Sequence, residues 1–131
     1  MEIQIRITGV VMLLLALLHI RFPRYFNWKE ELKSLSLINR QMMTVHMFFI
    51  ALMVFLMGLL CLTSAPDLAG TALGKLIALG MGIFWTTRLV FQLFVYSARL
   101  WRGKRFETSI HILFVLLWTY LGGIFVWTAL A

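Results

Sequence analysis

Four polar residues share one face of a long apolar segment, and their types could bind a ligand. Arg88, Gln92 and Tyr96 follow one another at four-residue intervals, and Arg99 comes one further turn along. Residues three and four apart lie on the same face of an α-helix, so these side chains form one stripe. Arg88 lies about 16 Å from Arg99 at 1.5 Å per residue. If Arg99 marks a membrane surface, Arg88 lies near the middle of a hydrocarbon core about 30 Å thick, where an arginine is costly and indicates a functional site.

Arg88 has no obvious carboxylate partner. All five acidic residues are expected at or near a membrane surface (Glu2, Glu30, Glu31, Asp67 and Glu107). The guanidinium must then be satisfied by backbone carbonyls and hydroxyls, by an aromatic ring or by a ligand. Trp118 falls at nearly the same depth in the last apolar run and could supply a cation–π contact. A ligand would instead offer an anionic or carbonyl oxygen to Arg88, Gln92 and Tyr96, and quinones, lipid phosphates and carboxylates all qualify; both interpretations stay open.

All three histidines are expected in one layer of the membrane. Counted inward from the nearest basic residues, His19, His46 and His111 lie about 3, 9 and 9 Å deep at 1.5 Å per residue. They come from three different apolar runs, and Glu107 precedes His111 by one turn. Three imidazoles and a carboxylate suit zinc, iron or another borderline ion, whereas two imidazoles could hold a haem iron between helices. The alternative is that each histidine hydrogen-bonds a backbone or tyrosine oxygen at the membrane edge.

Four apolar runs must position these residues. The chain has 131 residues, of which 62% are hydrophobic and 13% charged, and its mean hydropathy is +0.92. This composition is typical of a membrane protein rather than a soluble domain. The runs cover residues 3–20, 42–63, 71–98 and 108–130, and each reaches the length of about 18 residues expected of a spanning helix. We therefore predict an all-α fold, a four-helix transmembrane bundle that forms a single domain over residues 1–131 in a lipid bilayer.

The positions of the basic residues predict the orientation of the chain. Of its twelve Lys and Arg residues, five lie in the connection 21–41 and four in the connection 99–107, whereas the opposite side has only Arg6 and Lys75. Nine against two places both basic connections in the cytoplasm and both termini outside, and we expect a bacterial inner membrane. The first run is expected to be a true span rather than a signal peptide, because its positive charge follows the apolar core. Nucleic-acid binding is not expected, because no soluble basic module is present.

The connection 21–41 is predicted to carry a short amphipathic helix on the cytoplasmic leaflet. Pro23 is expected to stop the first span, and Asn27 with Glu30 resembles a capping box. The apolar side chains that follow lie near one face of this helix, and the charged side chains lie largely on the opposite face. The aromatic residues suit the membrane interface (Phe22, Tyr25, Phe26 and Trp28). The alternative is a plain connecting loop whose aromatic residues anchor the membrane edge.

Small residues and methionines predict packing surfaces. Gly74, Ala78 and Gly82 recur at four-residue spacing and would let a neighbouring helix approach closely. The methionines of the second run (Met42, Met43, Met47, Met53 and Met57) could ligate a soft metal, but we interpret them as adaptable packing scattered around the helix. The single cysteine, Cys61, excludes an internal disulfide and a Cys-x-x-Cys metal motif.

Together these features predict a small inner-membrane protein that binds a redox cofactor or metal in the cytoplasmic leaflet. The three histidines, with Glu107 as an optional ligand, would hold haem or a transition metal. The stripe from Arg88 to Tyr96, with Trp118, would line an adjoining cavity for a quinone or lipid head group. An enzyme of this kind would be a membrane oxidoreductase. Two other functions stay open: a non-catalytic subunit or scaffold that meets a protein partner, and a small oligomeric transporter or channel built from copies of this chain.

Overall fold

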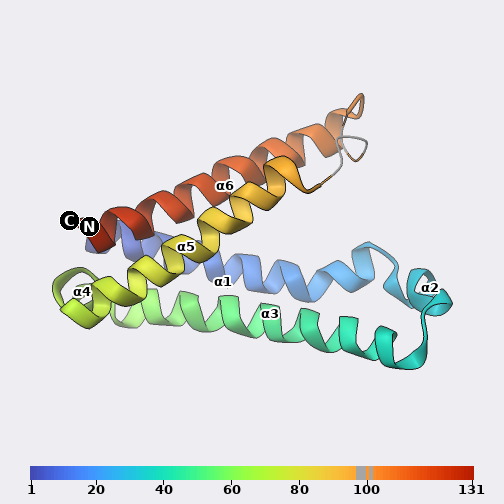
Figure 1. Ribbon diagram of the computed structural model, residues 1–131, viewed down its shortest axis with the longest axis horizontal. Coiled ribbons are helices and arrows are strands. Elements are labelled where there is room, and N and C mark those ends of the chain that lie inside the picture. The colour runs from blue at the N-terminus through green and yellow to red at the C-terminus, as the bar shows by residue number, and fades with distance from the viewer. Residues whose placement is uncertain (97–99, 101) are drawn as a thin grey trace. The chain divides into compact units, whose positions relative to one another are not determined.

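The computed structural model describes residues 1–96, 100 and 102–131 (Figure 1). Four of its helices are long and apolar enough to cross a membrane: α1 (Glu2–Tyr25), α3 (Leu37–Thr63), α5 (Ala72–Phe94) and α6 (Arg105–Leu130). The described residues contain no β-strand. The predicted all-α class and its four long apolar helices are therefore confirmed. Arg99 and the end of the predicted third span at residues 97–98 lie outside the described residues.

The chain divides into two compact units, each built on a pair of long helices. The α1–α3 unit comprises Ile5–Ala65, and the α5–α6 unit comprises Met1–Gln4 and Pro66–Ala131. Three short elements complete them: α2 (Trp28–Glu31) and the 3₁₀-helix η1 (Leu32–Ser34) in the first unit, and nearly all of α4 (Ala65–Gly70) in the second.

In the α5–α6 unit, the two long helices lie side by side and run in opposite directions (Figure 1). A Cβ atom on Gly82 would lie 2.8 Å from the side chain of Val126, and one on Gly122 would lie 2.8 Å from the hydroxyl of Thr86. The backbones can approach this closely because glycine has no side chain, as the sequence predicts for Gly82. Gly74, from the same predicted face, packs against the backbone of α4 instead.

Polar contacts between residues far apart in the sequence also stabilise this unit. Lys75 Nζ, near the start of α5, donates to the carbonyl oxygen of Ala131 at 2.7 Å. The hydroxyl of Tyr120 on α6 donates to Gln4 Oε1 at 2.7 Å. The first four residues of the chain therefore pack with α6.

In the α1–α3 unit, α1 and α3 meet at a pair of glycines. A Cβ atom on Gly9 would lie 2.9 Å from the backbone oxygen of Gly58, and a Cβ atom on Gly58 would lie 2.9 Å from that of Gly9. The contact is reciprocal, so each glycine admits the backbone of the other helix. Buried Met12, Val54 and Cys61 lie along the same pair of helices.

The connection between α1 and α3 differs from its predicted form at two residues. Pro23 lies inside α1 rather than at its end. In the last turn its missing N–H costs a single backbone bond, and Phe26 N still donates to the oxygen of Phe22 at 2.9 Å. Asn27 has φ 56° and makes no side-chain cap bond, so the predicted capping box with Glu30 is wrong. A capping box needs an extended N-cap residue, whereas the left-handed backbone of Asn27 turns the chain out of α1.

Candidate functional site

The predicted polar stripe is present at the end of α5. Arg88 Nη1 donates to Gln92 Oε1 at 3.5 Å, and Arg88 Nη2 donates to the hydroxyl of Tyr96 at 3.3 Å. Tyr96 lies two residues beyond the last residue of α5, Phe94. The backbone N–H of Tyr96 still donates to the oxygen of Phe91, at 3.2 Å. The chain therefore keeps turning after the helix ends, which brings the Tyr96 hydroxyl back to Arg88.

Aromatic rings lie beside the guanidinium of Arg88. Its Cζ atom is 5.0 Å from the ring centre of Trp118 on α6 and 5.2 Å from that of Tyr96. Both distances fall within the range of about 6 Å over which a cation is attracted to a ring. The Trp118 ring is also stacked with Trp85, at 5.2 Å between ring centres, and with Phe114, at 5.5 Å. The predicted contact between Arg88 and Trp118 is thus present, and further aromatic residues support it.

Gln92 is the centre of this network and is almost fully buried, with 6% of its surface exposed. Its Oε1 accepts from Trp118 Nε1 at 3.4 Å as well as from Arg88, and its Nε2 lies 2.9 Å from His111 Nδ1. An indole N–H and a guanidinium can only donate, so the amide atom facing them must be the oxygen. Gln92 Nε2 therefore donates to His111 Nδ1. That ring nitrogen must then be an acceptor, which places the ring proton on Nε2.

These residues form one group, which we call the α5–α6 polar cluster (Trp85, Arg88, Gln92, Tyr96, His111 and Trp118). The cluster has more hydrogen-bond donors than acceptors. Among the described residues Arg88 donates two hydrogen bonds, both to neutral oxygens at 3.3 Å or longer, although a guanidinium carries five N–H groups. Trp85 Nε1 is buried and has no hydrogen-bond partner in the described part of the chain. A ligand with an oxygen acceptor would complete the cluster.

Arg88 is half-buried, whereas the sequence predicts that it is buried. The described residues contain no fully buried charged side chain. The guanidinium stays partly exposed because the rings of Trp118 and Tyr96 cover only part of it, and the Tyr96 side chain is itself 45% exposed. No carboxylate within the described ranges pairs with Arg88, since the ion pair found there joins Lys33 to Glu30. The guanidinium is therefore accessible and is not neutralised by an acid.

The predicted metal ligands lie in different parts of the fold. His111 belongs to the α5–α6 unit, whereas His19 and His46 belong to the α1–α3 unit. His19 Nδ1 lies 2.8 Å from the backbone oxygen one turn earlier, as the alternative interpretation of the histidines predicts. Glu107 is exposed in the first turn of α6. In the portion of the chain that the structure describes, no three His, Cys, Asp or Glu side chains form a group that could hold a metal ion, so the metal or haem site stays a prediction.

Sequence reasoning misses one residue of the cluster, Trp85, and one contact, between Gln92 and His111. Trp85 precedes Arg88 by three residues and so lies on the same face of α5, which is a signal that the sequence contains. The hydrogen bond between Gln92 and His111 joins two helices, and nothing in the spacing of either helix indicates it. The protein itself engages both ends of the Gln92 amide group.

Similarity to other proteins gives no guide to this site. Comparisons of the chain with protein-family models, curated proteins and solved structures found no match. The chemistry of the α5–α6 polar cluster is therefore the basis on which a function can be assigned.

Proposed function

We propose that the chain is an integral membrane protein whose four long helices form a bundle across a bacterial inner membrane. These helices have 23 to 27 residues, more than the roughly 20 that a hydrocarbon core requires. The nine basic residues of the two connections favour a cytoplasmic location for those connections, with both termini outside. The segment from Trp28 to Ser34 would then lie at the cytoplasmic interface as a short amphipathic element.

We propose further that the α5–α6 polar cluster binds a lipid-soluble ligand through a carbonyl or anionic oxygen. The observation that carries this proposal is the excess of donors around Arg88 in an apolar helix pair. An arginine in such surroundings is costly unless its charge and its N–H groups are satisfied. A quinone is the class of ligand that fits best, because its carbonyl oxygens accept hydrogen bonds and its flat ring can pack against the aromatic side chains of the cluster.

Each residue has a defined role in this proposal. Arg88 donates to the ligand oxygen, and the Tyr96 hydroxyl, 3.3 Å from Arg88 Nη2, offers a second polar group at the exposed rim. Trp85 supplies a buried N–H donor whose partner the ligand or a bound water provides. Gln92 and Trp118 hold Arg88 in place. The redox group of the predicted function is then the quinone itself, and the protein takes part in membrane electron transfer.

Direct binding measurements on the full chain in nanodiscs test this function. Decylubiquinone is titrated while the saturable quenching of tryptophan fluorescence is followed, because Trp118 and Trp85 belong to the cluster. Loss of a hydrogen bond to a charged group costs about 1.5–3 kcal/mol, so Arg88→Gln should weaken binding by at least about tenfold. Tyr96→Phe removes a neutral group and should weaken binding by about two- to tenfold.

The matched control is Thr87→Val, next to Arg88. Thr87 is exposed, and its hydroxyl donates to the backbone oxygen of Ile83 in its own helix at 2.7 Å, so its removal should leave binding unchanged. A parallel titration with oleate identifies a carboxylate ligand if decylubiquinone does not bind. The proposal is refuted if Arg88→Gln, with wild-type helicity by circular dichroism, binds both probes as tightly as the wild type.

A further inference from the structure

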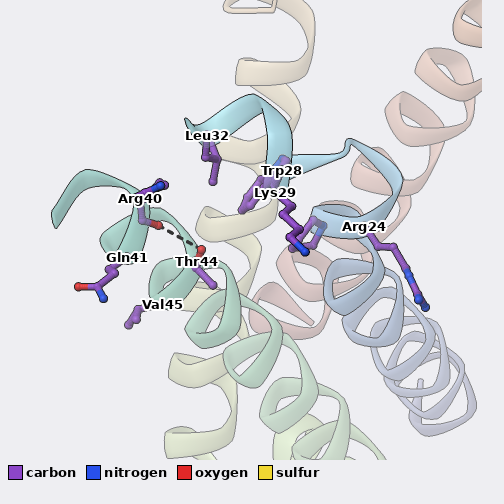
Figure 2. A pocket seen from close by; sticks show the side chains of 9 residues that line it. Arg24, Trp28, Lys29, Leu32, Arg40, Gln41, Thr44 and Val45 are labelled. Carbon is purple, nitrogen blue, oxygen red and sulfur yellow. Dashed lines mark hydrogen bonds between the residues drawn. The ribbon is translucent and has the colours of Figure 1, made fainter. Parts of the chain in front are cut away.

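An open pocket lies in the α1–α3 unit, at the connection between its two long helices. Its volume is about 710 Å³, comparable with small-molecule sites of roughly 300–1,000 Å³. Its lining comes from the end of α1, from α2 and η1, and from the beginning of α3 (Figure 2). We call it the basic cavity, and the residues that give it its chemistry are Arg24, Trp28, Lys29, Leu32, Arg40 and Val45.

The charge of the basic cavity is positive. Arg24 at the end of α1 and Arg40 on α3 lie on two sides of it, and Figure 2 shows Lys29 on α2 between them. No acidic residue lines the cavity. The ion pair found in the described ranges joins Lys33 to Glu30, outside the lining, so the three cations are not neutralised by carboxylates.

Two features of α3 strengthen the attraction for an anion. Arg40 is half-buried and is the fourth residue of this helix, which begins at Leu37. Ser36 caps the helix by accepting from Asn39 N, at 3.4 Å. The partial positive charge at the N-terminus of a long helix falls within its first turn and therefore adds to the charge of Arg40.

The remaining lining is apolar. Trp28 and Leu32 are half-buried, and Val45 continues into the apolar surface of α3, where Phe48 and Phe49 are exposed. A free anion would make no favourable contact with this apolar surface, whereas an amphiphile would bury its acyl chains along it. A basic rim that adjoins an apolar helix face is therefore complementary to a lipid with a negatively charged head group.

We propose that the basic cavity binds the phosphate of an anionic phospholipid, with the acyl chains along α3. Lys29 and Arg40 contact the phosphate, and Trp28 packs at the level of the head group. Arg24, whose guanidinium points away from these two residues in Figure 2, adds to the positive charge around the phosphate. This site depends on the membrane insertion proposed above, but not on the ligand proposed for Arg88. It would fix one lipid at the cytoplasmic ends of α1 and α3.

Native mass spectrometry of the full chain in a neutral detergent tests this site. The protein is titrated with phosphatidylglycerol and, separately, with phosphatidylcholine, and bound lipids are counted. We expect one tightly held phosphatidylglycerol. A basic residue near a lipid surface contributes about fivefold in affinity, so Arg24→Gln, Lys29→Gln and Arg40→Gln should each weaken binding by about that factor, and the triple variant by about a hundredfold. Arg40→Lys should bind within about twofold of the wild type, because it keeps the charge.

Arg21→Gln is the matched control, since Arg21 is exposed on α1, does not line the cavity and carries the same charge. Equal weakening by Arg21→Gln and Arg24→Gln would show diffuse attraction and overturn the site. Equal affinity for phosphatidylcholine would also overturn it, as would displacement of the lipid by millimolar inorganic phosphate, which would indicate a soluble anion. Arg88→Gln should leave phosphatidylglycerol binding unchanged, and the triple variant should still bind decylubiquinone, so the two proposals fail independently.

Discussion

Replacement of Gln92 by methionine should loosen the α5–α6 helix pair. Methionine has a similar length but cannot accept from Trp118 and Arg88 or donate to His111. The wild-type contacts are 3.4 Å from Trp118 Nε1, 3.5 Å from Arg88 Nη1 and 2.9 Å to His111 Nδ1. The 2.9 Å bond to His111 joins α5 to α6. The two longer bonds satisfy N–H groups of Trp118 and Arg88, which would otherwise lack the Gln92 oxygen as an acceptor.

The expected loss of stability follows from these distances. Hydrogen bonds between membrane helices contribute about 0.6 kcal/mol on average and about 1.7 kcal/mol at most. Trp118 is only 2% exposed, so its indole N–H would lose an acceptor in a buried position, which adds about 1 kcal/mol. We therefore expect Gln92→Met to lower the free energy of unfolding by about 1–2 kcal/mol.

Unfolding by sodium dodecyl sulfate in mixed micelles, followed by circular dichroism, measures this change. The matched control is Gln41→Met, the same substitution at an exposed position of α3, and it should leave stability unchanged. A double-mutant cycle of Gln92→Met with His111→Leu isolates the hydrogen bond between Gln92 and His111. Equal stability of Gln92→Met and the wild type, or a cycle with no coupling energy, would refute the central position of Gln92 in the network.

Three further predictions concern packing, protonation and topology. Gly58→Ala would place a Cβ atom 2.9 Å from a backbone oxygen of α1, so it should destabilise the protein by about 1–3 kcal/mol; Gly123→Ala, with nothing within 4 Å, should not. ¹⁵N NMR of labelled protein should show His111 with its proton on Nε2, and a proton on Nδ1 would contradict the orientation of the Gln92 amide. In a cysteine-free background, Ser34→Cys should react with an impermeant maleimide only after the inner membrane is opened, whereas Gly70→Cys should react in spheroplasts; the reverse pattern would invert the topology.

The helices and the stripe could be predicted because they depend on spacing along one chain. An apolar run of about 18 residues or more is long enough for a spanning helix, and four such runs gave four helices. The contacts of Arg88 with Gln92 and Tyr96 follow from their four-residue intervals, which keep the side chains on one face. Depth along the helix axis also placed Trp118 beside Arg88, and the two are in contact.

The histidines show where this reasoning ends. Counting residues from a charged end gives the depth of a side chain, but it gives neither the direction of the side chain nor the neighbour it meets. Depth predicts a shared layer for His19 and His111, but it does not predict that His19 contacts the backbone of its own helix or that His111 contacts Gln92. The predicted capping box at Asn27 is wrong for a related reason. The backbone of Asn27 is left-handed, and the chemistry of its side chain alone does not indicate this.

The polarity of the α5–α6 polar cluster makes it suited to reversible binding. Its hydrogen bonds run in one direction, from Arg88 and Trp118 to the Gln92 oxygen and from the Gln92 amide to His111. The bond from Arg88 to Gln92 is the longest of these, at 3.5 Å, and is the one that a ligand oxygen at Arg88 would replace. Gln92 would then still be held by Trp118 and His111, so the contact between the helices survives. In the proposed function, a ligand would therefore occupy and leave Arg88 while the helix pair keeps its structure, as a mobile carrier such as a quinone requires.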